Sequence, residues 1–108
     1  MKKIVYVIAN NNGGFHTELK EGYLITSKSG RLYGVSGTSG NWWITDILTG
    51  CIVGKCDKLN KVSETVTPKE QEIEKLIKSD KFTHIIAEVY ETYRFIKIKW
   101  FNELILNR

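Results

Sequence analysis

The first half of the chain alternates between short apolar stretches and turn-forming residues, which predicts a β-meander. The β-branched stretch Lys3–Ala9 ends in Asn-Asn-Asn-Gly-Gly, and Asn-Gly is a strong hairpin signal because both residues tolerate positive φ. We therefore expect a first hairpin that continues into Phe15–Leu19. Short strands at Tyr23–Thr26 and Arg31–Val35 should follow, joined by a tight turn at Lys28-Ser29-Gly30.

A second hairpin is predicted around Thr49-Gly50, which suits a two-residue loop between Trp42–Leu48 and Cys51–Lys55. Strand alternation divides the first of these strands into two faces, with Trp42, Ile44 and Asp46 on one and Trp43, Thr45 and Ile47 on the other. Because each face carries an indole, we expect both faces of the sheet to be covered.

The single proline marks the start of a predicted helix over residues 68–78. Thr67 can cap this helix, Pro68 supplies a preset φ at its first position, and Glu70 can complete a capping box. One apolar stripe should pack on the sheet while the lysines and glutamates between its members stay solvated. The stripe consists of Ile73, Leu76 and Ile77, and the solvated residues are Lys69, Glu72, Lys75 and Lys78.

Strand character returns in Phe82–Tyr90 and Arg94–Phe101, which predicts a last hairpin after the helix. The tail Asn102–Arg108 could extend the final strand, form a helical turn or cover a sheet edge. The fold class we expect is α+β, mainly an antiparallel β-meander of about six to eight short strands with one amphipathic helix packed on the sheet.

The composition is that of one globular domain spanning residues 1–108, with 42% hydrophobic and 26% charged residues. The longest apolar stretches are far shorter than the roughly 20 residues that cross a bilayer, so no membrane partner is expected. The start, Met1-Lys2-Lys3, lacks the cleavage site of a secretory signal and is interpreted as the first strand. Cys51 and Cys56 form no disulfide framework, so we expect reduced thiols and a cytoplasmic location.

The net charge of +4 favours anionic partners, but Lys, Glu and Asp intermingle and form no basic stripe of the kind that duplex-binding domains carry. A glycine-rich segment, Gly34–Gly40, could bring backbone N–H groups close to a phosphate. Ser36, Thr38 and Ser39 would add hydroxyl donors, and Lys28 or Arg31 would add charge. Alternatively the segment is a flexible loop between strands, since no capped helix follows it.

Two further patterns resemble catalytic or metal-binding motifs but do not match them. The segment Gly50–Cys56 is one residue short of a P-loop, and Cys56 cannot replace the hydroxyl that binds magnesium. The cysteines, His16 and His84 lack the spacing of a zinc site. We therefore expect no cofactor, no metal and no enzymatic activity, and an enzyme that uses Cys51 or His84 is the last alternative.

Aromatic and basic side chains gather in the predicted C-terminal hairpin, where rings could stack on a base while cations meet phosphates. They are Tyr90, Tyr93, Arg94, Phe95, Lys97, Lys99 and Phe101. Alternatively the helix or a second subunit covers these rings, which makes a homo-oligomer an expected state. Trp42 and Trp43 carry the same alternatives, because one of two adjacent indoles on a strand must point away from the main core.

The leading hypothesis is a non-enzymatic binding protein for a small anionic, nucleotide-like ligand. Its predicted ligand-binding residues are Lys28, Arg31, Ser36, Thr38, Ser39, Trp42, Trp43, Tyr93, Arg94, Phe95 and Lys97. The small size, the lack of catalytic motifs and the Lys-, Ile- and Asn-rich composition resemble small phage and mobile-element proteins of AT-rich bacteria. That resemblance implies sequestration of a cyclic-nucleotide immune signal. The alternatives are an anti-defence inhibitor that binds a host protein, and a single-stranded nucleic-acid binder whose affinity falls with salt.

Overall fold

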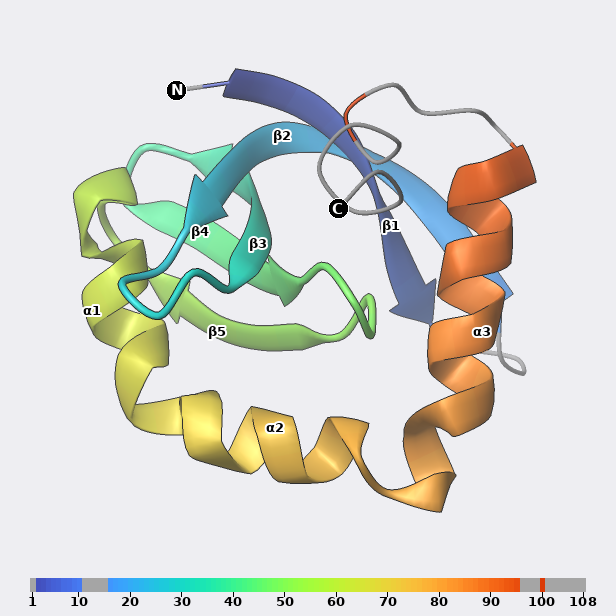
Figure 1. Ribbon diagram of the computed structural model, residues 1–108. Coiled ribbons are helices and arrows are strands. Elements are labelled where there is room, and N and C mark those ends of the chain that lie inside the picture. Colours follow the sequence, from blue (N-terminus) through green and yellow to red (C-terminus); the bar gives the residue numbers. More distant parts are fainter. Residues whose placement is uncertain (1, 11–15, 96–99, 101–108) are drawn as a thin grey trace.

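The computed structural model describes residues 2–10, 16–95 and 100, which form an antiparallel sheet with helices packed against it (Figure 1). The sheet has five strands in chain order, so every neighbouring pair is a hairpin. The strands are β1 (Lys2–Asn10), β2 (His16–Thr26), β3 (Leu32–Thr38), β4 (Asn41–Asp46) and β5 (Ile52–Cys56). The predicted α+β class and the antiparallel meander are confirmed, although the described residues form fewer strands than expected.

One strand is missing from the predicted count because β2 runs unbroken through Gly22. A Cβ at Gly22 would collide with the carbonyl oxygen of Val35 and the hydroxyl of Ser36. This glycine therefore marks a close approach of two chain segments rather than a turn. The first hairpin is confirmed by the pairing of β1 with β2, from Lys2 opposite Leu24 onward, while Phe15 lies outside the described residues.

The second hairpin is also confirmed, since β4 and β5 pair in antiparallel fashion. Its connection is longer than the predicted two residues, because β4 ends at Asp46 and β5 begins at Ile52. The predicted division of faces holds: Trp42 and Ile44 pack in one core cluster, while Trp43 lies on the opposite face.

The free edge of β1 is covered by contacts from distant parts of the chain. The N–H of Ala9 donates to the carbonyl of Gly50 at 2.8 Å. The N–H of Val7 donates to the hydroxyl of Tyr93 at 2.9 Å, and the indole Nε1 of Trp100 donates to the carbonyl of Val5 at 2.8 Å. The β1 edge is thereby blocked against pairing with another chain.

Helical structure begins earlier than predicted, so the proposed capping box is wrong. A short 3-10 turn (Leu59–Lys61) leads into α1 (Val62–Val66), and a second one (Thr67–Lys69) leads into α2 (Glu70–Ile77). Thr67 has helical φ and ψ and donates its hydroxyl to the carbonyl of Ser63 at 2.6 Å, so it cannot act as an N-cap. The predicted end of the helix is confirmed. Within the stripe, Ile73 is buried but the Leu76 side chain is exposed.

The prediction of strands at Phe82–Tyr90 and from Arg94 onward is wrong, because this part of the chain forms the helix α3 (Asp80–Phe95). Its apolar residues recur three and four positions apart, which is the spacing of one face of a helix. This spacing determines the structure here, although aromatic and β-branched residues favour strands. These apolar residues are Phe82, Ile85, Ile86, Val89, Tyr90 and Tyr93. The remainder of the predicted hairpin, at residues 96–99 and 101, and the tail at 102–108 lie outside the described residues.

Two core clusters hold the layers together. α1 and α2 cover the face of the sheet that carries Tyr33, Val35 and Ile44. α3 lies beside β1, as Figure 1 shows, and its Tyr93 is part of the second core cluster. Among the described helices, none is long and apolar enough to cross a membrane.

Candidate functional site

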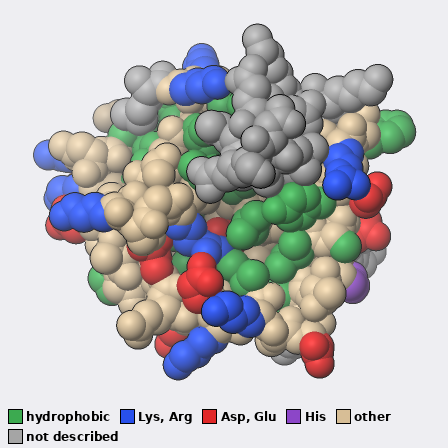
Figure 2. All heavy atoms as spheres, viewed as in Figure 1, with side chains coloured by type: hydrophobic (Ala, Val, Ile, Leu, Met, Phe, Trp, Pro, Cys, Tyr) green, Lys and Arg blue, Asp and Glu red, His purple; other side chains and the backbone are tan. Residues whose placement is uncertain are grey.

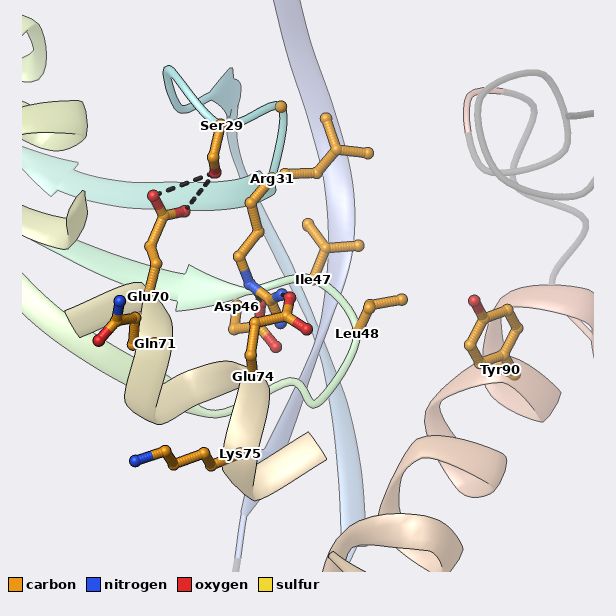
Figure 3. A pocket seen from close by; sticks show the side chains of 12 residues that line it. Ser29, Arg31, Asp46, Ile47, Leu48, Glu70, Gln71, Glu74, Lys75 and Tyr90 are labelled. Atoms are coloured by element: carbon orange, nitrogen blue, oxygen red, sulfur yellow. Dashed lines mark hydrogen bonds and ion pairs between the residues drawn. The ribbon is translucent and has the colours of Figure 1, made fainter. Parts of the chain in front are cut away.

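Two hollows in the described part of the protein gather polar, charged and aromatic side chains. The larger one, with a volume of about 930 Å³, lies between the β2–β3 turn, the β4–β5 connection, α2 and α3 (Figure 3). We call it the Arg31 hollow, and its other lining residues include Asp46, Ile47, Glu70, Glu74 and Tyr90. Figure 2 shows a hydrophobic surface beside charged side chains in this region.

Arg31 is positioned by the turn that precedes it. The N–H of Ser27 donates to the carbonyl of Arg31 at 2.8 Å, which brings the chain back at the start of β3. The Arg31 side chain is only 10% exposed, its Nε donates to Asp46 Oδ1 at 2.9 Å, and its Nη1 donates to Glu74 Oε1. The third nitrogen, Nη2, is buried and has no hydrogen-bond partner among the described residues.

The hydrogen bonds of Asp46 explain why Nη2 of Arg31 has no partner among the described residues. Asp46 Oδ2 accepts hydrogen bonds from the N–H of Thr49 at 3.1 Å and from its hydroxyl at 2.9 Å. A bidentate pair would need both carboxylate oxygens for Arg31. Because Thr49 occupies one of them, Asp46 binds the guanidinium through the other alone.

Glu70 anchors α2 to the sheet through three hydroxyl groups. Its carboxylate accepts hydrogen bonds from Ser27 and Tyr33 at 2.8 Å each and from Ser29 at 3.1 Å. Burial is the largest influence on the pKa of Glu70 and acts to raise it, but the hydroxyl donors and Arg31 together lower the pKa below its ordinary value. Burial and the neighbouring Glu70 raise the pKa of Tyr33. Glu70 is therefore ionised and Tyr33 protonated near neutral pH.

The charges that line the Arg31 hollow do not favour a strongly anionic ligand. Three carboxylates (Asp46, Glu70 and Glu74) and two cations (Arg31 and Lys75) line the hollow, which leaves a formal charge of −1. Two of the carboxylates already pair with Arg31. A polyphosphate would therefore meet net repulsion here.

The second hollow lies on the face of β4 that carries Trp43 and Thr45, opposite to the face that carries Trp42 and Ile44. Its volume is about 210 Å³. All five strands line it, and we call it the sheet mouth. It is lined by Tyr6, Ile8, Lys20, Ser36, Gly37, Trp43, Thr45 and Ile52. Cross-strand register brings these residues together, because Tyr6 lies opposite Lys20 and Trp43 lies opposite both Ser36 and Lys55.

The indole of Trp43 is the main aromatic surface of the sheet mouth, and one ammonium group lies over its ring. Trp43 is 46% exposed, and the Nζ of Lys55 lies 4.9 Å from the centroid of its ring. Lys20 lines the same hollow. Glu18 shares this face of β2, where a hydrogen bond with His16 at 3.0 Å is the main reason that its pKa is lowered. The sheet mouth thus combines an aromatic surface with a local excess of positive charge.

The floor of the sheet mouth consists of hydroxyl groups that already have partners. Ser36 donates its hydroxyl to the carbonyl of Glu21 at 2.7 Å, so Tyr6 donates to Ser36. Burial raises the pKa of Tyr6, although its bond to Ser36 acts in the opposite direction, so this hydroxyl stays protonated. The floor is therefore a fixed neutral surface beneath the indole.

The cysteines contribute no reactive group to either hollow. Cys51 and Cys56 are free thiols, and burial raises the pKa of both. A protonated thiol is a poor nucleophile and a poor metal ligand. Within residues 2–10, 16–95 and 100, no group of three or more His, Cys, Asp and Glu side chains could hold a metal ion.

The structure separates the residues of the predicted site into several places. Lys28 and Arg31 lie at the β2–β3 turn, whereas Thr38 and Ser39 lie at the far end of β3, where Thr38 pairs with Asn41 around a tight turn. The glycine-rich segment is thus a strand and a hairpin turn rather than a flexible loop. Ser36 and Trp43 meet at the sheet mouth, and Trp42 packs on the other face with its ring centroid 6.1 Å from that of Tyr23.

Of the aromatic and basic residues predicted in the C-terminal region, Tyr90 lines the Arg31 hollow, whereas Tyr93, Arg94 and Phe95 on α3 line neither hollow. Tyr93 is fully buried beneath β1, Arg94 pairs with Glu91 at 3.9 Å, and Phe95 is 87% exposed. Lys97 lies outside the described residues. Sequence reasoning missed Lys20, Lys55 and Glu74 as site residues, and it missed the pairing of Asp46 with Arg31. Only the strand register and the helix packing bring these side chains to the hollows.

Comparison of the chain with models of protein families, with curated proteins and with solved structures finds no match.

Proposed function

We propose that the protein is a non-enzymatic binding protein for a small anionic, nucleotide-like ligand and that it holds this ligand at the sheet mouth. The observation that supports the proposal is the half-exposed indole of Trp43, with the ammonium group of Lys55 over its ring and Lys20 lining the same hollow. Stacking of a base on an aromatic side chain contributes about 1–3 kcal/mol per base. The lysines are placed to meet the phosphate of the same ligand.

The size of the sheet mouth limits how much of the ligand it can enclose. Its volume of about 210 Å³ is below the roughly 300–1,000 Å³ of pockets that enclose drug-sized ligands. One base would therefore enter, with the sugar and the phosphate at the rim near the lysines. A cyclic nucleotide carries the same groups, so sequestration of a cyclic-nucleotide signal is the specific form of this proposal.

Tryptophan fluorescence tests the proposal directly. Adenosine monophosphate, cyclic di-AMP and a short oligo(dT) are titrated into the wild type, Trp43→Leu and the matched control Trp42→Phe. We expect saturable quenching in the wild type and in Trp42→Phe, because Trp42 lies on the opposite face. Trp43→Leu should bind at least about tenfold more weakly, which corresponds to the loss of one stacking contact. Unchanged affinity in Trp43→Leu, measured by calorimetry, would contradict the proposal.

The same titrations separate a free nucleotide from a nucleic-acid strand. A single-strand binder should prefer oligo(dT) to the mononucleotide, and its affinity should fall steeply with salt because phosphate contacts release counterions. A small-ligand protein should bind both probes with similar strength and with a shallow salt dependence.

A protein partner or a second copy of the chain is the other candidate, and the exposure of Phe95 favours it. This ring is 87% exposed at the end of α3. Large exposed aromatic side chains are enriched at protein interfaces. Sedimentation of the wild type and of Phe95→Ser tests this candidate: an oligomer that dissociates in the variant would support it, and a monomer in both would argue against self-association.

A further inference from the structure

The Arg31 hollow supports an inference that is independent of the nucleotide proposal. We propose that it is a second ligand site, which takes a small organic monoanion with an apolar body, and that the carboxylate of this ligand replaces Glu74 on Arg31.

The unpartnered nitrogen of Arg31 is the first argument. The side chain is nine-tenths buried, and two of its three guanidinium nitrogens bind carboxylates. Nη2 is buried without a hydrogen-bond partner in the described part of the chain. Buried donors are almost always paired, because an unpaired one keeps the cost of losing water without a compensating bond. A ligand carboxylate has a second oxygen that can accept from this nitrogen.

The two partners of Arg31 differ in how firmly they are held. The Asp46 side chain is 1% exposed, and Thr49 binds its second oxygen twice. The Glu74 side chain is 53% exposed, so its carboxylate can turn into solvent at little cost. Figure 3 shows the Glu74 carboxylate lying beside the guanidinium, on the helix that borders the hollow. Glu74 is therefore the partner that a ligand can exchange.

The position of α2 does not depend on Glu74. Glu70, one turn earlier, already joins this helix to the β2–β3 turn and to β3 through its bonds with Ser27, Ser29 and Tyr33. Release of Glu74 from Arg31 would therefore leave the wall of the hollow in place.

The charge balance sets the ligand at one negative charge. When a carboxylate takes the place of Glu74, Arg31 still faces two anions, as it does in the free protein. Further ligand charges would lie near Asp46 and Glu70, and Lys75 is the one other cation among the described residues that line the hollow. The site therefore suits a monocarboxylate and disfavours a polyphosphate.

The rest of the hollow suits an apolar or aromatic body. Leu32, Ile47 and Leu48 line it, and Figure 3 shows Tyr90 on α3 across the hollow from Arg31. The volume of about 930 Å³ falls within the roughly 300–1,000 Å³ of small-molecule pockets. A ligand with a carboxylate at one end and a ring system at the other would meet both sides.

Calorimetric titration with 1-naphthoate tests this assignment, with 1-naphthalenemethanol as the neutral probe and a naphthalene dicarboxylate as the dianion. We expect naphthoate to bind most tightly of the three. Glu74→Gln should raise its affinity about tenfold, because the competing charge is gone. The matched control Glu72→Gln removes the same charge from an exposed position of α2 outside the hollow, and should change the affinity by less than about twofold.

Arg31→Lys should lower naphthoate affinity about tenfold, because an ammonium cannot replace the planar fork of donors. If this variant fails to fold, the comparison of Glu74→Gln with Glu72→Gln still tests whether Glu74 competes with the ligand for Arg31. The proposal would be overturned by any of three results. The two substitutions could have equal effects, the alcohol could bind more tightly than naphthoate, or neither the wild type nor Glu74→Gln could bind naphthoate. Trp43→Leu should leave naphthoate affinity unchanged, so the two proposed sites can fail separately.

Discussion

At the scale of single residues, Gly34 determines how the sheet packs on itself. A Cβ at this position would lie 2.6 Å from the ring of Tyr6, which is buried at 1% exposure. The absence of a side chain lets the Tyr6 ring lie flat against β3 and reach the hydroxyl of Ser36. Gly34 therefore serves packing in the strand rather than access of the backbone to a phosphate.

Gly34→Ala should destabilise the fold by about 1–3 kcal/mol, because the added methyl group overpacks a filled space. The matched control is Gly54→Ala in β5, where the nearest atom to a new Cβ is the flexible end of Lys69 at 3.2 Å. Urea unfolding of both variants measures the difference. Equal stabilities of Gly34→Ala and the wild type would show that the Tyr6 ring can move away at no cost.

The sequence indicates individual binding residues, but it does not show which side chains they pair with. Arg31 was predicted as a binding residue from its charge beside a glycine-rich segment, and it does line a hollow. Its partners, Asp46 and Glu74, lie 15 and 43 positions away in the chain. Pairing over such distances depends on which strands and helices meet, and periodicity within a segment does not contain that information.

At the scale of elements, local signals predicted the strands better than the helices. The Asn-Gly and Thr49-Gly50 signals correctly indicated hairpins, although the Asn-Gly turn lies outside the described residues and the second connection is longer than two residues. Pro68 correctly marked helical structure, but the hydroxyl of Thr67 binds the preceding turn because α1 already exists before it. α3 was missed because aromatic and β-branched residues favour strands in isolation, whereas their spacing buries one helical face against β1.

Glu70 joins two elements, and its ionisation should make stability depend on pH. Its pKa in the folded protein is lowered, so its contribution is present above the ordinary pKa of 4.5 and is lost as pH falls through the folded value. Glu70→Gln should reduce the free energy of unfolding at pH 7 by about 1–3 kcal/mol, because three hydroxyl donors lose a charged acceptor.

The stability difference between wild type and Glu70→Gln should then shrink as pH is lowered from about 7 to 3, since protonation removes the same charge from the wild type. Thermal or urea unfolding across this range measures it. Glu72→Gln, on the exposed side of α2, serves as the control and should follow the wild type within about 0.5 kcal/mol. A difference for Glu70→Gln that stays constant down to pH 3 would contradict the ionised role of Glu70.

At the scale of the whole molecule, both edges of the sheet receive side chains from the part of the chain that follows β5. Val5 and Val7 of β1 bind Trp100 and Tyr93, and Lys69 Nζ donates to the carbonyl of Val53 in β5 at 3.0 Å. Edge-to-edge pairing of strands is a common route to unwanted assembly. The homo-oligomer that the sequence suggested would therefore form more readily through exposed side chains such as Phe95 than through strand pairing.

Tyr93→Phe tests whether the hydrogen bond at the β1 edge contributes to stability and protects that edge. The substitution keeps the ring in the core but removes the hydroxyl oxygen that accepts the hydrogen bond of Val7 N–H, so it should cost about 1–3 kcal/mol of unfolding free energy. Hydrogen exchange should accelerate at the Val7 amide, whereas Tyr23→Phe, the same change on β2 where the ring packs against Trp42, should leave that amide protected. If Val7 stays equally protected in Tyr93→Phe, the burial of β1 beneath α3 protects the edge without the hydroxyl. Faster exchange with self-association at higher concentration would instead mean that this single hydrogen bond keeps β1 from pairing with another chain.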